Sequence, residues 1–572
     1  MLGVPSRPPR AAQTFRVTSS PTLPSLDAAA APLWRRLLEH PLFLGTVLLL
    51  PIVWLLWPVP IDETRYLAVA WEMRQTGEFL VPHLNGATYA HKPPLLFWLI
   101  NLGWLFTGVH AWTARAMTML CSILSLLLLQ RLTLRLTGSA SAARMSMWAL
   151  LGAVYFAGFA NAIMFDVPLT TCVLLAVHGL CDLVDGRTRR GIWLTGAAIG
   201  LGILVKGPVM LLDIAFVALG APWWSGKLAD RRGHYFGAFA LAFLLGAAIA
   251  LAWAIPAALH GGADYARAIF LNQTLDRIEG AVGASTHGRP WWWYFAVFPL
   301  MLLPWPLVIR GSWTKLRALA DEPALRLALI WVVPTFVAFS AIGGKQPHYL
   351  LPVVPAVALG VAFAYERAAL QVRSGLFALL LVLLGVLAAA APYFAALRGN
   401  LEYFEEASPT WGVALVALGI AVLVCARRAR TPVWPALAML VVTLLVKLAV
   451  IEGPGQRYDM TPIGEQIAAV QRRGQPIVHL GWHHGVYEFA GRLTQPLETL
   501  DDVKQLDAWA TLHPDGLVVT FYRRYRFRAA PIFSQPFRGV EVSIWKVGDA
   551  LASGRDPSVE HTREAGEDSS DD

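Results

Sequence analysis

Apolar residues in this chain come in blocks near 20 residues long, separated by short polar stretches. A helix rises about 1.5 Å per residue, so roughly 20 apolar residues cross the ~30 Å hydrocarbon core of a bilayer. The thirteen blocks that we interpret as spans are 41–59, 113–130, 142–160, 164–182, 190–205, 208–222, 236–258, 291–309, 325–342, 348–365, 375–397, 410–426 and 432–451. The pattern predicts an all-α polytopic membrane domain over 41–452.

The basic residues between the blocks test this count, because loops rich in Lys and Arg stay in the cytoplasm. The first 40 residues carry five arginines, and we expect them to form a disordered cytoplasmic leader. Alternation then places every basic loop on the same side: Arg131/Arg135/Arg144, Arg187/Arg189/Arg190, Lys227/Arg231/Arg232, Arg310/Lys315/Arg317, Arg367/Arg373 and Arg427/Arg428/Arg430. An odd number of spans places the C-terminus outside.

One apolar stretch, LLFWLINLGWLFT at 95–107, would break this alternation if it crossed the bilayer. We therefore predict that 62–112 is one long external loop with juxtamembrane helices. Within it, 93–109 forms an amphipathic or re-entrant helix in the membrane interface. An ordinary membrane span is the alternative interpretation.

Residues 453–550 have a different pattern. Strand-like runs PIVHLG, GLVVTFY and VEVSIWKV alternate with helix-like runs near 461–473 and 501–511, which predicts a small external α/β domain. His483 and His484, near His479, are interpreted as surface polar residues without a metal. The acidic, Ser-rich stretch 551–572 is expected to be a disordered tail.

Composition agrees with a membrane protein. The chain is 56% hydrophobic and 15% charged, against about 25% charged residues in a typical soluble domain. The net charge of +9 lies mainly in loops, so it is a topology signal and does not indicate nucleic acid. The four cysteines lie inside or at the ends of apolar blocks and are interpreted as small buried hydrophobes.

With this topology, charged and polar residues gather at the external ends of the helices. Charged groups at membrane depth are costly and usually mark function or a paired partner. The candidates are Asp62, Glu63, Arg65, His91, Lys92, Asp166, Lys206, Asp276, Arg277, His287, Arg289, Lys345, His348 and Tyr349.

Each candidate also has a simpler interpretation. Asp62 can cap the helix that follows it, and Lys206 and Lys345 can be lysines that reach toward the interface. The histidines can be hydrogen-bonded interfacial residues, and the aromatic run 291–294 fits a belt at the start of a span. Their convergence on one face favours chemistry on a phosphate-bearing lipid. Lys and Arg would hold the phosphate, and carboxylates would act as base, orienting group or metal ligand.

The ordered motifs DETRY, GEFLVPHLNGATYAHKPPLLFW, FDVPL, LVKGP, HGRPWWWY and GGKQPHYLLP resemble those of the bacterial aminoarabinose transferase family. That family is part of the GT-C superfamily, which also contains the protein O-mannosyltransferases. The resemblance covers about residues 42–365. It implies a glycosyltransferase of the bacterial inner membrane that moves a sugar from a polyprenyl (undecaprenyl) phosphate carrier to a periplasmic acceptor. In the aminoarabinose branch that acceptor is a phosphate of lipid A.

The resemblance also assigns roles to residues. Asp62 would be the principal catalytic carboxylate, and Asp166 a second acidic residue of the site. The remaining substrate-binding candidates are Lys92 at the carrier phosphate, Arg277 or Arg289 as cationic help, Tyr89 and Tyr349 lining the cavity, Lys206 and Lys345 at the acceptor or carrier end, and Glu63 beside Asp62.

The chain departs from the family pattern at two places. The family usually has an acidic residue before the lysine of KPP, and a metal ion is associated with that residue and a later histidine. Here that position is His91, so a zinc site would rest on His91 and His287. NQTLDR at 272–277 replaces the more usual run containing EH. The sugar is left open.

We expect inversion by direct displacement at the anomeric carbon. With a hydroxyl acceptor, Asp62 would take its proton, and with a phosphate acceptor it would orient groups or stabilise positive charge. Two alternatives remain: a protein O-mannosyltransferase-like enzyme acting on Ser or Thr, and a transporter or flippase of lipid-linked substrates. A transporter would place its charges near the bilayer midplane and show an internal hydropathy repeat.

Overall fold

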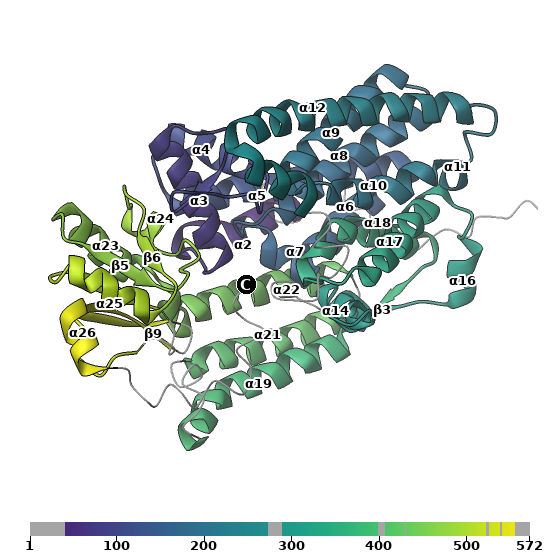
Figure 1. Ribbon diagram of the computed structural model, residues 1–572. Coiled ribbons are helices and arrows are strands. Elements are labelled where there is room, and N and C mark those ends of the chain that lie inside the picture. The colour runs from purple at the N-terminus through teal and green to yellow at the C-terminus, as the bar shows by residue number, and fades with distance from the viewer. Residues whose placement is uncertain are drawn as a thin grey trace, which may run out of the picture.

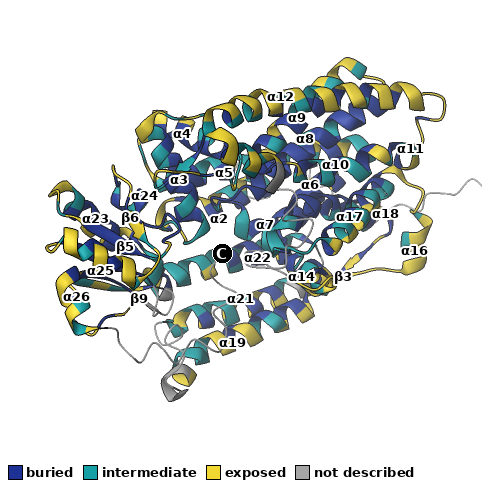
Figure 2. Cartoon of the chain, viewed as in Figure 1, coloured by how far each residue is buried: buried dark blue, intermediate teal, exposed yellow. Residues whose placement is uncertain are grey.

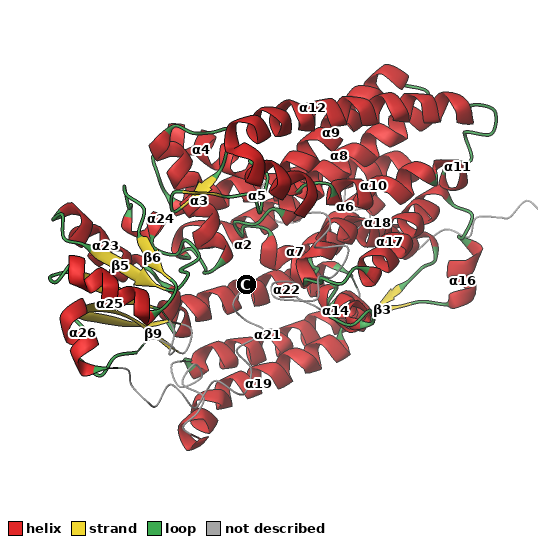
Figure 3. Ribbon diagram, viewed as in Figure 1, coloured by secondary structure: helices red, strands yellow, loops and turns green. Residues whose placement is uncertain are grey.

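The computed structural model describes residues 40–272, 289–398, 407–428, 431–521, 526–537 and 540–554, and every structural statement below concerns these residues. Residues 1–39 of the expected leader and residues 555–572 of the expected tail lie outside them. The chain forms a large helical body and a smaller domain that contains most of the strands, seen at the left of Figures 1 and 3.

The helical body follows the apolar blocks. Its longer helices are α2 (Pro41–Leu55), α3 (Asp62–Thr76), α4 (Leu95–Thr107), α5 (Ala111–Thr137), α6 (Ala140–Leu151), α8 (Asp166–Val184), α9 (Thr188–Lys206), α10 (Val209–Leu219), α12 (Arg232–Arg267), α14 (Trp293–Met301), α17 (Pro323–Ala341), α18 (Val354–Arg367), α19 (Gly375–Arg398), α21 (Pro409–Arg428) and α22 (Val433–Glu452). The short ones are α7 (Val154–Phe159), α11 (Ala221–Trp224), η1 (Ala268–Asn272), α15 (Trp305–Val308), α16 (Trp313–Ala318) and η2 (Pro347–Val353).

All thirteen apolar blocks contain helix, which confirms the predicted all-α membrane domain. Seven helices among the described residues are long and apolar enough to cross a membrane, judged by length and composition. The blocks 142–160 and 291–309 are each broken into two helices, at Gly152–Ala153 and at 302–304. The count of thirteen spans stays a prediction. α8 is central, with nearly every residue buried, whereas α12 and α19 are exposed along one face (Figure 2).

Loops that were predicted to share one side of the membrane meet in the structure. Arg135 pairs with Asp182 at 2.9 Å and with Asp185 at 2.7 Å, and Lys227 pairs with Asp185 at 2.8 Å. Likewise, β3 (Ile309–Arg310) pairs antiparallel with β4 (Gln371–Val372). Asp182 lies near the C-terminal end of α8, so this basic end is about 24 Å along the helix from Asp166, the first residue of α8.

The apolar stretch 95–107 forms α4, which packs against α3 and α5. Its 13 residues extend about 20 Å, too short to cross the hydrocarbon core. The amide of Asn101 anchors it to α3 by donating to the Ala70 carbonyl at 3.0 Å. This length and placement support the prediction of an interfacial helix.

The C-terminal domain is built on a five-stranded sheet of order β6-β5-β7-β9-β8. Its elements are η3 (Pro454–Tyr458), α23 (Thr461–Arg472), β5 (Ile477–Leu480), α24 (Glu488–Gly491), β6 (Glu498–Leu500), α25 (Val503–Leu512), β7 (Leu517–Thr520), β8 (Phe533–Phe537), β9 (Val540–Lys546) and α26 (Val547–Ser553). β6, β5 and β7 are parallel, whereas β9 is antiparallel to both β7 and β8.

Both faces of this sheet are covered, which explains why its central strands are apolar throughout. Ile477 faces α23 in one apolar cluster, and the next residue, Val478, faces α25 in another. Successive strand residues point to opposite faces, so a sheet with helices on both sides needs apolar residues at every position. The predicted α/β domain is confirmed, although β6 and β8 were not recognised in the sequence.

Candidate functional site

Asp62 is the first residue of α3, and the capping position before it is occupied by Ile61, so Asp62 is not the N-cap residue. Its Oδ1 instead accepts hydrogen bonds from Arg65 Nη2 at 2.6 Å and from the Tyr66 hydroxyl at 3.0 Å. Residues three and four positions apart are neighbours on a helix surface. One turn of helix therefore holds the carboxylate in place.

The surroundings of Asp62 favour its ionised form. Burial alone would raise its pKa, but the Arg65 guanidinium, the nearby charge of Lys92 and the Tyr66 hydroxyl together lower that pKa below its ordinary value of 3.8. Tyr89 is close enough to interact electrostatically with Arg65. The structure therefore brings three predicted site residues together at the start of α3: Asp62, Tyr89 and Lys92.

An aromatic wall connects this group with Asp166. Tyr66 meets the ring of Phe165 edge to face at 4.8 Å between centroids, and Lys92 Nζ lies 6.0 Å from the centre of the same ring. Phe165 immediately precedes Asp166 in the chain. Lys92 therefore lies close to the residue that precedes Asp166, although the two come from different parts of the sequence.

Asp166 and Lys206 form a buried ion pair, in which Lys206 Nζ donates to Asp166 Oδ1. Lys206 Nζ also lies 4.6 Å from the centre of the Tyr349 ring, which is a favourable position for a cation. Lys206 ends α9 and Asp166 begins α8, so the antiparallel packing of these helices brings their ends together. Lys206 is thus an internal partner and not a lysine that reaches to the interface.

His348 lies near both groups. It interacts electrostatically with Asp166 and Lys206 on one side and with Lys92 and Asp62 on the other. Its ring also meets Tyr349 edge to face at 4.9 Å. The two carboxylates and two lysines therefore belong to one site at one end of the helical body.

Glu63 was predicted to bind substrate, but the structure places its side chain in a buried ion pair. Its carboxylate accepts two hydrogen bonds from Arg115, at 3.0 and 2.5 Å, and two from the backbone N–H groups of Val59 and Ile163, at 2.8 and 2.9 Å. Both partners of the ion pair are buried. A carboxylate with four donors inside the protein has little capacity left for a substrate, so we correct this assignment to a structural one.

Lys345 and Arg289 connect two loops near the site. Lys345 is buried, and its Nζ donates to the carbonyls of Arg289, at 2.9 Å, and of Ile342. Arg289 is exposed, and its guanidinium lies 5.8 Å from the centre of the Trp293 ring. Lys345 is therefore engaged with backbone oxygens instead of reaching toward the interface.

The predictions for Asp276, Arg277 and His287 concern residues outside the described part of the chain. His91, the other proposed zinc ligand, is exposed next to the ring of Tyr89, at 5.3 Å. Among the described residues, no three His, Cys, Asp or Glu side chains gather in a way that fits a metal ion. The zinc site stays a prediction, and no chemical step below depends on it.

Sequence reasoning missed two features of this region. It listed Arg65 as a candidate without predicting its contact with Asp62 and passed over Tyr66, although their spacing of three and four residues from Asp62 on a helix was the available signal. It also passed over Asp213 in the apolar helix α10. Asp213 is buried near the charges of Lys206 and Asp166, and within the described structure neither of its carboxylate oxygens has a hydrogen-bond partner.

The histidines of the C-terminal domain were interpreted as surface residues, and this is wrong. His483 and His484 are both buried, and so is His479, which lies within the apolar strand β5. His479 Nδ1 donates to the Gly481 carbonyl at 2.7 Å, and its Nε2 lies 3.2 Å from the Tyr487 hydroxyl. Nearby, His483 Nδ1 lies 3.3 Å from the buried carboxylate of Glu488.

Replacing Glu488 with Gln should make the stability of the protein less dependent on pH. Burial raises the pKa of Glu488 from 4.5 to about 7. The folded state therefore loses stability as pH rises through the window from 4.5 to 7, by up to roughly 3 kcal/mol. The thermal stability of Glu488→Gln minus that of the parent should therefore increase from pH 5 to pH 8, when full-length protein is unfolded in detergent. A stability difference between variant and parent that is equal at pH 5 and pH 8 contradicts this prediction. The matched control is Glu465→Gln, a substitution at an exposed glutamate of the same domain.

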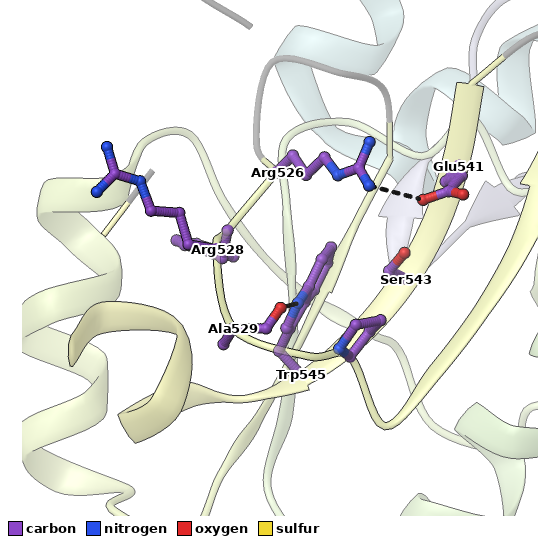
Figure 4. Close-up of a pocket in the computed structure, with 8 residues that line it drawn as sticks. Arg526, Arg528, Ala529, Glu541, Ser543 and Trp545 are labelled. Carbon is purple, nitrogen blue, oxygen red and sulfur yellow. Dashed lines mark hydrogen bonds and ion pairs between the residues drawn. The ribbon is translucent and has the colours of Figure 1, made fainter. Parts of the chain in front are cut away.

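A separate hollow lies in the C-terminal domain, lined in part by Arg526, Arg528, Glu541, Ser543 and Trp545 (Figure 4). Arg526 and Glu541 form an ion pair in it at 3.8 Å, and both of these side chains are more than half exposed. An exposed pair of this kind is weakly held. The convergence of buried and paired groups at Asp62 and Asp166 makes that region the better candidate for a catalytic site.

Comparison with known proteins supports the resemblance seen in the motifs. Residues 91–253 match the family described as dolichyl-phosphate-mannose-protein mannosyltransferase. Curated relatives include the undecaprenyl phosphate-alpha-4-amino-4-deoxy-L-arabinose arabinosyl transferase of Pseudomonas aeruginosa LESB58, 32% identical over 312 residues. A transferase of the same name from Sodalis glossinidius is 32% identical over 331 residues. These alignments cover 52% and 55% of this chain, and 54% and 56% of the relatives, so they span little more than half of each protein.

Solved structures show the fold. The crystal structure of ArnT from Cupriavidus metallidurans bound to undecaprenyl phosphate superposes with a TM-score of 0.71. The match covers 90% of this chain and 98% of that protein, at 20% sequence identity. The apo state of the same protein gives a TM-score of 0.68. The chain therefore has the fold of these proteins, a helical membrane body with a small α/β domain, as the sequence predicted.

Proposed function

We propose that this protein is a membrane glycosyltransferase that moves a sugar from undecaprenyl phosphate to a phosphate of lipid A. The observation that carries the proposal is the meeting of Asp62 and Lys92 with the Asp166–Lys206 pair, joined by His348, at one end of the helical body. The names of the curated relatives and the undecaprenyl phosphate bound in the ArnT crystal structure support this choice of donor.

The proposed reaction breaks the bond between the anomeric carbon and the carrier phosphate oxygen and forms a new bond to an acceptor phosphate oxygen. The leaving phosphate keeps the electron pair, and Lys92 and Lys206 stabilise its developing charge. Asp62, held ionised by Arg65, faces the positive charge that develops on the sugar. A phosphate acceptor is already ionised and needs no base, whereas a hydroxyl acceptor would give its proton to Asp62.

We further propose that the site and the C-terminal domain face the periplasm and that the protein lies in the bacterial inner membrane. The basic loops joined through Asp182 and Asp185 form the opposite end of the helical body, as expected for a cytoplasmic side. An alkaline phosphatase reporter fused after residue 554 should therefore be active. An inactive fusion that is stably expressed contradicts this orientation.

A second candidate is protein O-mannosyltransferase-like activity on Ser or Thr, because the matching family over 91–253 has that description. Mass spectrometry of lipid A and of periplasmic glycoproteins, with and without the gene, distinguishes the two. We expect a sugar on lipid A phosphate that disappears with the gene. A sugar lost only from proteins supports the second candidate instead, and no change in either fraction contradicts both.

Replacing Arg65 with Gln should move the acidic limb of the pH–rate profile to higher pH. In the parent, Arg65 opposes the effect of burial and keeps the pKa of Asp62 below 3.8. Without that cation, burial raises the Asp62 pKa, and the active carboxylate is protonated at a higher pH. The measurement is kcat/KM for sugar transfer as a function of pH. Arg65→Lys retains a cation and should shift the limb less, and an unmoved limb in Arg65→Gln contradicts the role of Arg65.

A further inference from the structure

The C-terminal domain contacts the helical body through residues 481–497, which we call the docking segment. Two side chains bind backbone across this contact. Trp71 on α3 donates its indole N–H to the Leu493 carbonyl at 2.8 Å, and Arg492 donates to the carbonyl of Val109, between α4 and α5, at 3.0 Å. The docking segment therefore holds α3 and the α4–α5 connection at once.

A second connection is made through the β1–β2 hairpin (His83–Leu84 and Ala87–Thr88). Its two-residue turn, Asn85–Gly86, has positive φ at both residues, as hairpins of this type require. The Asn85 amide donates to the Leu497 carbonyl at 2.8 Å and accepts from the Leu497 N–H at 2.7 Å. This reciprocal pair fixes the hairpin tip against the C-terminal domain.

The interior of this contact is aromatic. The Arg492 guanidinium lies 3.8 Å from the centre of the Phe489 ring and 5.5 Å from that of Trp71. On its other side, Phe489 stacks on Trp104 of α4 at 5.7 Å with an interplanar angle of 11°. Gly485 approaches so closely that an added Cβ would lie 2.6 Å from Leu84 Cδ1. Such close packing resists relative movement of the two parts.

The elements held in this way carry the site. α3 begins with Asp62 and presents Trp71 to the docking segment two and a half turns later. The hairpin leads directly to Tyr89 and Lys92, and the Tyr89 N–H donates to the Pro82 carbonyl at 2.7 Å across its base. Asp62 belongs to α3 and Lys92 follows the hairpin, and the docking segment contacts both α3 and the hairpin.

We propose that the C-terminal domain positions the catalytic site: Arg492 and Asn85 hold α3 and the hairpin in the arrangement that places Lys92 beside Asp62. This inference rests on the proposed function for its kinetic consequence, whereas its structural consequence can be measured without any substrate. Neither residue touches the reacting groups, so both act as positioning residues.

The experiment compares Arg492→Met, which keeps an apolar stem but removes the donors, with Asn85→Gly, which keeps the positive φ but removes the amide. Hydrogen exchange of full-length protein in detergent reports on residues 83–92, and steady-state kinetics report on transfer. Both variants should exchange at least tenfold faster in this stretch and lose at least tenfold in kcat, with KM for the donor within twofold. Arg492→Lys should recover part of the protection from exchange and part of kcat.

A disulfide tether between the hairpin and the C-terminal domain tests whether holding the hairpin in place is sufficient to restore activity. A Cβ built on Gly86 lies 3.5 Å from Pro496 Cβ, within the range for a disulfide, so Gly86→Cys with Pro496→Cys should cross-link on oxidation. Gly86 has φ 79°, so the cysteine there is strained, and the reduced double variant is the reference for the oxidised one. Added to Arg492→Met, the oxidised tether should restore both slow exchange and kcat, and its reduction should abolish the rescue. The control is Arg528→Met, an exposed arginine of the same domain, which should change neither quantity.

The outcomes separate this inference from the proposed function. Unchanged exchange in both variants overturns the positioning role, as does faster exchange with unchanged kcat or a formed tether that rescues neither quantity. If the parent transfers no sugar, the proposed function fails, and the exchange measurement alone still decides whether the domain positions α3 and the hairpin.

Discussion

Replacing Asp62 with Asn is expected to lower the rate of sugar transfer by roughly 10²–10³-fold, the range typical for loss of one group that stabilises charge in the transition state. The substitution keeps the size of the side chain and an oxygen that can accept hydrogen bonds from Arg65 and Tyr66. It removes the negative charge opposite the developing charge on the sugar. The measurement is kcat for purified protein with a polyprenyl-phosphate sugar and lipid A.

The control for this prediction is Asp264→Asn, an exposed carboxylate near the end of α12 that should leave kcat unchanged. Expression and membrane insertion of Asp62→Asn should equal those of the parent, because the charge lies at the start of a helix and is not part of the buried Glu63–Arg115 pair. A variant with full activity removes Asp62 from the mechanism.

Glu63→Gln should instead act on stability. Glu63 and Arg115 are buried together, with side chains 7% and 1% exposed, so losing the carboxylate charge leaves a guanidinium without compensation. Breaking a buried pair in this way costs about 3–5 kcal/mol. We expect a correspondingly large fall in the free energy of unfolding, measured by denaturation of full-length protein in detergent.

A second substitution identifies the cause of that loss. Adding Arg115→Met to Glu63→Gln removes the unpaired cation and should recover part of the stability. The earlier interpretation of Glu63 as a substrate-binding residue predicts the opposite result for the single variant: ordinary stability with a raised KM for the donor. That outcome would restore the sequence-based assignment.

Much of the fold could be predicted because it depends on local patterns. The period of apolar residues located the helices, and loop charges predicted which loops share a side, as the contacts of Arg135 and Lys227 with Asp185 confirm. In the C-terminal domain, the apolar runs identified β5, β7 and β9. β6 and β8 were missed because ETL and FSQPF have a mixed, partly exposed pattern.

The candidate site was only partly predictable. Motif order selected Asp62, Lys92, Asp166 and Lys206, and the structure brings these four together. The order of the motifs could not show that the side chain of Glu63, adjacent to Asp62, points away from the site to Arg115. Residues outside the motifs, such as Asp213 in an apolar helix, gave no signal beyond a charge where hydrocarbon was expected.

By itself, the sequence determined the helical membrane body, the short apolar helix after the first span and the α/β character of the C-terminal domain. These depend on hydrophobic period and near-neighbour spacing. Only the tertiary structure decided which distant groups meet. Asp166 binds Lys206, which is 40 positions away in the sequence. Glu63 binds Arg115, 52 positions away, and Asn85 binds Leu497, 412 positions away. The reason is physical: such pairs are set by how helices rotate and pack against one another, and no short stretch of sequence encodes that.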